Sequence, residues 1–152
     1  MKILKGIVIV MAVLFVAAQL VRPPRINPPF DESETIYATG NVPSDVRAIL
    51  ERSCADCHSH MTRWPWYSNL APVSWLVAQD VKEAREELNF SKWADYPPER
   101  AEHKLEEICE MVGDGEMPLR TYVFTHEEAA LSGTDRSRLC EWSSAWRAEI
   151  LR

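Results

Sequence analysis

The sequence of 152 residues predicts an all-α protein. From Pro43 onward, apolar side chains recur at helical spacing, and no segment alternates apolar and polar residues as a strand would. Capping residues and prolines stand where several of these stretches begin, and one of them ends at a glycine. We therefore expect a small helical domain over 43–152, preceded by segments of different composition over 1–21 and 22–42.

The first segment, 1–21, is expected to be a membrane or export segment. Lys2 and Lys5 flank an unbroken apolar run that reaches Ala18. Counted from Ile3 to Val21, the run is at the lower end of the ~17–25 residues that span a bilayer. Its Val16-Ala17-Ala18 end also suits cleavage of a signal peptide. We favour a single-pass anchor in the cytoplasmic membrane over a soluble periplasmic protein, and both alternatives place the domain on the periplasmic side.

The second segment, 22–42, is expected to be a Pro-rich linker. Pro23-Pro24 and Pro28-Pro29 stiffen the chain and remove backbone donors. Asp31-Glu32-Ser33-Glu34 adds charge without apolar periodicity. The composition predicts a spacer that holds the domain away from the membrane.

Two helices are expected in the first half of the domain. Ser44 can cap a helix that leads into residue 54, and a second helix covers about 72–88. The apolar face of the first helix consists of Val46, Ile49 and Leu50. The face that we expect the second helix to turn toward the core consists of Trp75, Leu76, Ala78 or Gln79, and Val81.

The second half of the domain predicts two longer helices and a short one. One helix starts near Pro98 and ends at Gly113. Thr125 and Glu128 resemble a capping box for a short helical turn, and Ser132 with Asp135 resembles another that opens the last helix. The apolar faces of the two longer helices are Leu105, Ile108, Cys109 and Val112, and Leu139, Trp142, Trp146 and Ile150.

The motif Cys54-Ala55-Asp56-Cys57-His58 predicts covalent attachment of one c-type haem. Two thiols three positions apart lie on one face of a helical turn, where each can add to a vinyl group of the same haem. The histidine that follows is then held beside the iron as the proximal ligand. A dithiol redox site would need a βαβ setting, and a zinc site would need a second ligand pair. The sequence offers neither.

Met117 is the best candidate for the distal iron ligand. It lies between Gly115 and Pro118, in a glycine-containing loop that can bring a thioether close to the iron. The alternative is a surface methionine in a turn. The order of haem helix, ligand loop and aromatic C-terminal helix is that of small cytochromes c. The other sulfur and imidazole side chains are too close to His58, off the apolar face or unsupported, namely His60, Met61, His103, Met111 and His126.

Several aromatic and cationic side chains near the motif are candidates for a haem pocket. Arg63 or Arg85 can pair with a propionate, or carry an ordinary solvated charge. The aromatic candidates, which can equally be core residues, are Trp64, Trp66, Tyr67 and Trp75. Cys109 and Cys140 can form a disulfide in an oxidising compartment or remain plain core residues, and the sequence leaves both alternatives open.

The sequence resembles the cytochrome c-like haem-binding domain family of bacterial envelope proteins. The resemblance is carried by the run from Cys54 to Trp75, which joins the haem motif to Trp-Pro-Trp-Tyr-Ser, and by 80–81 and 88–93. The stretch 115–118 and the closing Leu131, Ser132, Asp135, Leu139 and Trp142 match as well, so the likeness covers roughly 40–150. It implies a haem cofactor and an N-terminal membrane segment. Leu119 departs from the family pattern, in which a second proline often follows Met-Pro.

Two function classes follow from these observations. One is electron transfer by a six-coordinate haem, with a redox partner protein that the sequence does not name. The other is a ligand sensor or peroxidase-like enzyme with an open or displaceable sixth position. No distal acid–base pair for peroxide cleavage is evident, so we favour electron transfer, which is not an enzymatic role. The formal net charge of −6 argues against nucleic acid as a partner.

Overall fold

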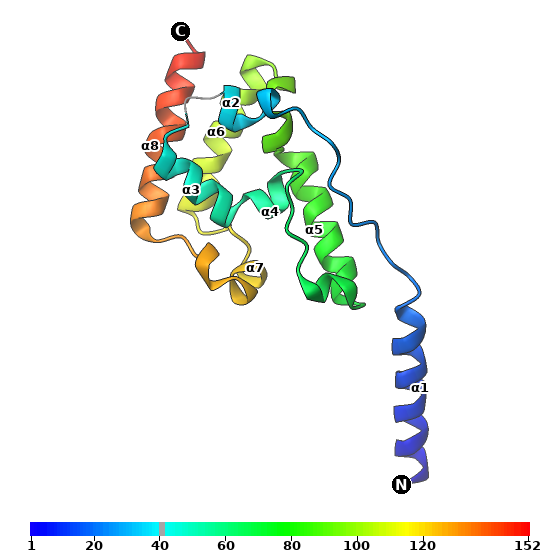
Figure 1. Ribbon diagram of the computed structural model, residues 1–152. Helices are drawn as coiled ribbons and strands as arrows, with labels where there is room; N and C mark the ends of the chain where they lie inside the picture. Colours follow the sequence, from blue (N-terminus) through cyan, green and yellow to red (C-terminus); the bar gives the residue numbers. More distant parts are fainter. Residues whose placement is uncertain (40–41) are drawn as a thin grey trace.

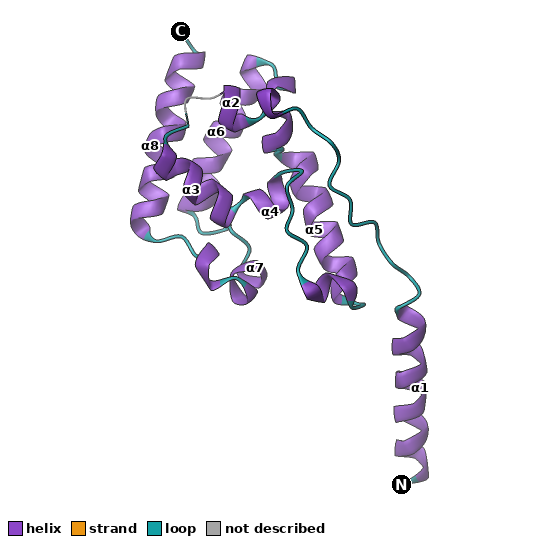
Figure 2. Ribbon diagram, in the orientation of Figure 1, coloured by secondary structure: helices purple, strands orange, loops and turns teal. Residues whose placement is uncertain are grey.

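The computed structural model describes residues 1–39 and 42–152, and every regular element within these ranges is a helix (Figures 1 and 2). The all-α prediction is therefore confirmed for the described residues. In chain order the elements are α1 (Lys2–Ala18), η1 (Glu32–Glu34), α2 (Ile36–Thr39), α3 (Ser44–Ser53), α4 (Ala55–His58), η2 (Trp66–Asn69), α5 (Val73–Glu87), η3 (Phe90–Asp95), α6 (Pro98–Gly113), α7 (Arg120–Thr125), η4 (Glu127–Ala129) and α8 (Gly133–Ile150).

Helices α6 and α8 lie side by side and form one half of the domain (Figure 1). Their facing apolar side chains, such as Leu105 and Leu139, are fully buried. A disulfide between Cys109 and Cys140 joins the two helices, with an S–S distance of 1.98 Å. Of the two alternatives for these cysteines, the structure therefore has the disulfide.

The predicted capping box of the last helix is present. The hydroxyl of Ser132 accepts from the backbone N–H of Asp135, and the Asp135 carboxylate accepts from the backbone N–H of Ser132. The short helical turn predicted after Thr125 is present as η4, but the predicted box is not, because the N-cap of η4 is His126 and makes no side-chain cap hydrogen bond. Helix α7 already ends at Thr125, whose hydroxyl donates back to the carbonyl oxygen of Tyr122 at 3.1 Å, so it caps no following helix.

Helix α5 matches the predicted span but turns a different face inward. Val81 is buried as expected, whereas Trp75 is 39% and Leu76 is 64% exposed. Trp75 faces the N-terminal part of the chain, where its indole N–H donates to the carbonyl oxygen of Val21 at 2.8 Å. Helical periodicity showed which residues of α5 are apolar and lie along one face. It could not show which of these residues the rest of the domain covers.

Helix α1 is shorter than the apolar run from Ile3 to Val21. The helix has 17 residues and ends at Ala18. The side chain of Gln19, the next residue, donates to the carbonyl oxygen of Phe15 at 2.9 Å and also reaches the main chain of Ala71. Within the described ranges, no helix is both long and apolar enough to cross a membrane. The predicted transmembrane helix is therefore not supported.

Residues 22–39 pack against the domain, and we call this segment the N-terminal strap. It runs beside α5 in Figure 1, and Ile36 of α2 is fully buried in the core. The asparagine side chain of Asn27 donates to the carbonyl oxygen of Thr62 at 2.9 Å. A segment that we expected to be a spacer thus contributes core and hydrogen bonds. Gly40 and Asn41, within the predicted linker, lie outside the described residues.

Candidate functional site

The motif from Cys54 to His58 forms one short helical turn, which is separated from α3 by a non-helical residue. Helix α3 ends at Ser53, and Cys54 takes the non-helical angles φ −128° and ψ −39° before α4 begins. The N–H groups of Cys57 and His58 both donate to the carbonyl oxygen of Cys54, at 3.1 and 2.9 Å. Both cysteines of the motif are free thiols. The turn therefore holds Cys54, Cys57 and His58 close together.

Burial keeps the two thiols of the motif protonated. It raises the pKa of Cys54 to about 12 and the pKa of Cys57 to about 11. A reactive dithiol pair has the opposite property, a lowered thiol pKa in an electropositive setting. The environment of Cys54 and Cys57 therefore does not resemble that of a dithiol redox site.

The imidazole of His58 is fixed by the last turn of α5. Its Nδ1 lies 3.0 Å from the carbonyl oxygen of Ala84 and 3.0 Å from that of Leu88. Carbonyl oxygens only accept hydrogen bonds, so we assign the proton of the neutral ring to Nδ1. Burial lowers the pKa of His58, which favours this neutral form. The Nε2 lone pair is then available to a metal, as in histidine ligands whose other nitrogen is held by a carbonyl.

Phe90 and Tyr37, two aromatic residues that the sequence did not indicate as site residues, extend from His58 into the core. The ring of Phe90, almost fully buried, lies 6.0 Å from the His58 ring, and the ring of Tyr37 lies 6.3 Å from Phe90. The buried hydroxyl of Tyr37 has no hydrogen-bond partner among the residues that the structure describes. Tyr37 was overlooked because it belongs to the strap, where no periodic pattern marks a residue as part of the domain.

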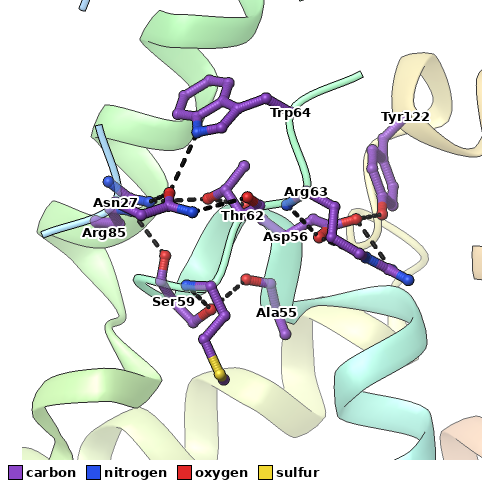
Figure 3. A network of polar contacts seen from close by, with 10 residues as sticks. Asn27, Ala55, Asp56, Ser59, Thr62, Arg63, Trp64, Arg85 and Tyr122 are labelled. Carbon is purple, nitrogen blue, oxygen red and sulfur yellow. Dashed lines mark hydrogen bonds and ion pairs between the residues drawn. The ribbon is translucent and has the colours of Figure 1, made fainter. Parts of the chain in front are cut away.

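A buried carboxylate inside the motif connects three segments (Figure 3). Asp56 is 7% exposed, and its Oδ1 accepts from the backbone N–H of Arg63 at 3.0 Å and from the guanidinium of Arg63 at 3.1 Å. Its Oδ2 accepts from the hydroxyl of Tyr122 at 2.9 Å. Asp56 thereby joins α4 to the chain that follows it and to α7. No motif or periodicity in the sequence indicated the pairing of Asp56 with Tyr122.

Arg85 of α5 binds four oxygen atoms of other segments, and Figure 3 shows its partners Ser59, Thr62 and Asn27. It donates to the carbonyl oxygen of Ser59 at 2.8 Å and to the hydroxyl of Thr62 at 2.8 Å. It also donates to the carbonyl oxygen of Ile26 at 2.9 Å and to the side-chain oxygen of Asn27 at 3.0 Å. Both guanidinium groups considered for a propionate, those of Arg63 and Arg85, are therefore engaged with protein partners.

Met117 lies in the loop between α6 and α7. Gly115 adopts φ +74°, and a Cβ there would lie 3.2 Å from the Arg136 guanidinium. The chain then turns back, so that the N–H groups of Glu116 and Met117 both donate to the carbonyl oxygen of Met111, at 3.0 and 3.1 Å. Met117 is partly buried against the core, and Pro118 follows through a cis peptide bond.

The four predicted pocket aromatics have different surroundings. Trp64 and Trp75 donate their indole N–H groups to the N-terminal side of the molecule, at Asn27 and Val21. Trp66 is 75% exposed, and its ring lies edge-on to that of Tyr67 with centroids 5.9 Å apart. The hydroxyl of Tyr67 contacts α7 through a hydrogen bond of 3.0 Å with the hydroxyl of Thr125.

The remaining imidazoles have protein partners. The ring of His126 stacks on Tyr122 with centroids 4.3 Å apart. His103 is exposed and lies near acidic side chains of its own helix, on the solvent side as predicted. The buried Nε2 of His60 lies 3.0 Å from the amide nitrogen of Asn89.

Two apolar side chains at the start of α5 are exposed, Leu76 by 64% and Val73 by 42%. They precede Ala84, the carbonyl partner of His58, by eight and eleven residues, which is about 12 and 16 Å along the helix axis. This exposed apolar surface is therefore at the far end of α5 from His58.

A family model for a haem-binding domain matches residues 13–145. The chain belongs to the haem-binding domain family. The resemblance noted from the motif and its flanks is thus confirmed. The match begins within α1 and ends within α8, so it includes the strap and α4 to α7. Neither the curated proteins nor the solved structures contain a significant match to this haem-binding domain.

The residues of this haem-binding domain fit a haem. His58 has its Nδ1 occupied by carbonyl oxygens and its Nε2 available. The thiols of Cys54 and Cys57 are unbridged on the same turn. The buried ring of Phe90 lies 6.0 Å from the ring of His58. An iron ligand, two attachment groups and an apolar ring therefore occur together.

Proposed function

We propose that this haem-binding domain carries one covalently attached haem c and transfers electrons in the bacterial cell envelope. The observation that carries the proposal is the state of His58, because Ala84 and Leu88 hold its Nδ1 while two free thiols lie on the same turn. That arrangement suits a permanently positioned axial ligand next to an attachment site.

Each residue of the proposed site has a defined role. The thiols of Cys54 and Cys57 form the thioether bonds, and the imidazole of His58 is the proximal ligand. The thioether of Met117 is the distal ligand. When bound, the haem supplies an iron that cycles between its ferric and ferrous states.

The surroundings of His58 support a role in electron transfer. Its two carbonyl partners are Ala84, in the last turn of α5, and Leu88, the C-cap residue whose own N–H donates to Ala84. Because these two residues are tied together, we expect the ligand to change little between oxidation states. Met117 is an uncharged ligand that favours ferrous iron, as in cytochromes c. A sensor or peroxidase-like enzyme would instead need a vacant sixth position, which the absorption spectrum of the ferric protein would reveal.

We also propose a location outside the cytoplasm. Residues 1–21 direct export, and they are either retained in the cytoplasmic membrane or removed after Ala18. Either outcome puts the haem domain on the periplasmic side. Fractionation of cells with N-terminal sequencing distinguishes the two, and recovery of the intact chain in the cytoplasm would contradict the proposal.

Covalent attachment is the decisive test. Protein produced with the haem c maturation machinery should keep its haem through acid–acetone extraction and on a denaturing gel. Cys54→Ser/Cys57→Ser should lose all covalent haem. Cys109→Ser/Cys140→Ser is the matched control, because it also removes two cysteines but leaves the motif intact, and it should retain covalent haem. Extraction of haem from the unmodified protein would overturn the proposal.

A further inference from the structure

Helix α7 is weakly attached to the rest of the domain although it follows Met117 closely. The helix spans Arg120–Thr125 and buries none of its residues. Among the described elements its extensive packing is with η4, the element directly after it. Apolar burial therefore contributes little to its position, and polar contacts must decide where it lies.

Two tyrosine hydroxyls tie α7 to other segments, and they differ in kind. Tyr122 donates to the carboxylate of Asp56 at 2.9 Å, inside the haem motif, and Asp56 is 7% exposed. Tyr67 pairs with the hydroxyl of Thr125 at 3.0 Å, at the exposed surface. A hydrogen bond to a buried charged group is worth more than one between neutral, exposed groups. The bond between Tyr122 and Asp56 should therefore dominate (Figure 3).

The loop that carries Met117 is fixed at both ends. Behind Met117, the carbonyl oxygen of Met111 holds the N–H groups of Glu116 and Met117. Ahead of it, the chain enters α7, where Tyr122 binds Asp56. Asp56 is the residue immediately before Cys57 and His58, so this bond links the loop of the distal ligand directly to the turn of the proximal one.

We propose that Tyr122 is a positioning residue that keeps the Met117 loop closed over the haem by binding Asp56. The inference rests on the proposed function, in which Met117 is the distal ligand. Loss of the Tyr122 hydroxyl releases the front end of the loop, and Met117 then leaves the iron more often.

The test compares Tyr122→Phe with Tyr67→Phe in the haem-loaded protein. Each variant removes one phenolic hydroxyl, that of Tyr122 within α7 or that of Tyr67, which binds α7. The two changes are therefore matched in chemistry. Tyr122→Phe should increase the rate of carbon monoxide binding to the ferrous protein about tenfold or more, as expected for loss of a bond to a buried charge. It should also add a high-spin fraction to the ferric spectrum and speed hydrogen exchange of the amides of 120–125. Tyr67→Phe should change each readout less than about threefold.

A second control separates the position of α7 from the state of Asp56. Arg63→Gln removes the other side-chain partner of Asp56 and keeps the hydroxyl of Tyr122, so its spectrum should stay low-spin. The proposal is overturned if Tyr67→Phe or Arg63→Gln opens the site as much as Tyr122→Phe, or if Tyr122→Phe has no effect.

Hydrogen exchange of α7 separates this proposal from the proposed role of Met117 as the distal ligand. If Met117→Ala left the spectrum unchanged, Met117 would not be the ligand, yet faster exchange in Tyr122→Phe would still show that Tyr122 holds α7.

Discussion

The α4–α5 side and the α6–α7 side of this haem-binding domain hold their candidate ligands in different ways. On the α4–α5 side, His58 is bound by two carbonyl oxygens, from the last turn of α5 and from its C-cap residue. Arg85 joins the same helix to the chain after His58 and to the strap. On the α6–α7 side, Met117 lies in a loop whose forward attachment is a short helix without buried residues. We infer that the proximal ligand is preset by the fold and that the distal ligand is the adjustable one.

The largest expected effect comes from Met117→Ala, which removes the adjustable ligand. Ferric haem should become high-spin or water-ligated, and ferrous haem should bind carbon monoxide faster than in Tyr122→Phe. The midpoint potential should fall because the ligand that favours ferrous iron is lost. Absorption spectra and a redox titration measure these changes. Met111→Ala and His126→Ala should leave the spectrum nearly unchanged, whereas a high-spin form in His126→Ala alone would make histidine the ligand.

Removal of the disulfide between α6 and α8 should have the next largest effect, and it should change only the stability of the protein. Cys109 and Cys140 are 31 residues apart, so Cys109→Ser/Cys140→Ser should lower the unfolding free energy by about 3–4 kcal/mol. The two helices also share a buried apolar interface, and for that reason the fold should persist at room temperature. Denaturant unfolding of the haem-loaded protein checks the value. A large change in the ferric spectrum would mean that the disulfide also positions the Met117 loop.

Arg85→Leu should have a smaller effect, confined to the α4–α5 side. The change removes four hydrogen bonds, of which two are partly buried, so the unfolding free energy should fall by about 2–3 kcal/mol. Amides of 25–27 in the strap should exchange faster, while those of α7 should not. Lys82→Leu, on an exposed position of the same helix, is the control and should be nearly neutral. Equal protection of the strap in Arg85→Leu would show that other contacts hold it.

Part of the fold and site was predictable because its causes are local. The capping box of Ser132 and Asp135 involves residues three apart, and the bounds of α6 follow from Pro98 and Gly113. The spacing within Cys54–His58 likewise needs only one helical turn. The face of α5 was mispredicted because exposed Leu76 and buried Val81 are equally apolar in the sequence, and only the neighbouring elements decide which is covered.

By itself, the sequence determined the helical class, the haem-binding family and the motif of the candidate site, since each depends on residue types at short, fixed spacings. The tertiary structure alone decided what surrounds the motif. The carbonyl oxygens that orient His58 come from 26 and 30 residues further along the chain, and the Tyr122 that binds Asp56 comes from 66 residues away. The strap reaches Arg85 across 58 and 59 residues. Such contacts follow from how the helices pack, and no periodicity or motif in the chain encodes which distant carbonyl, hydroxyl or guanidinium will lie within hydrogen-bonding distance.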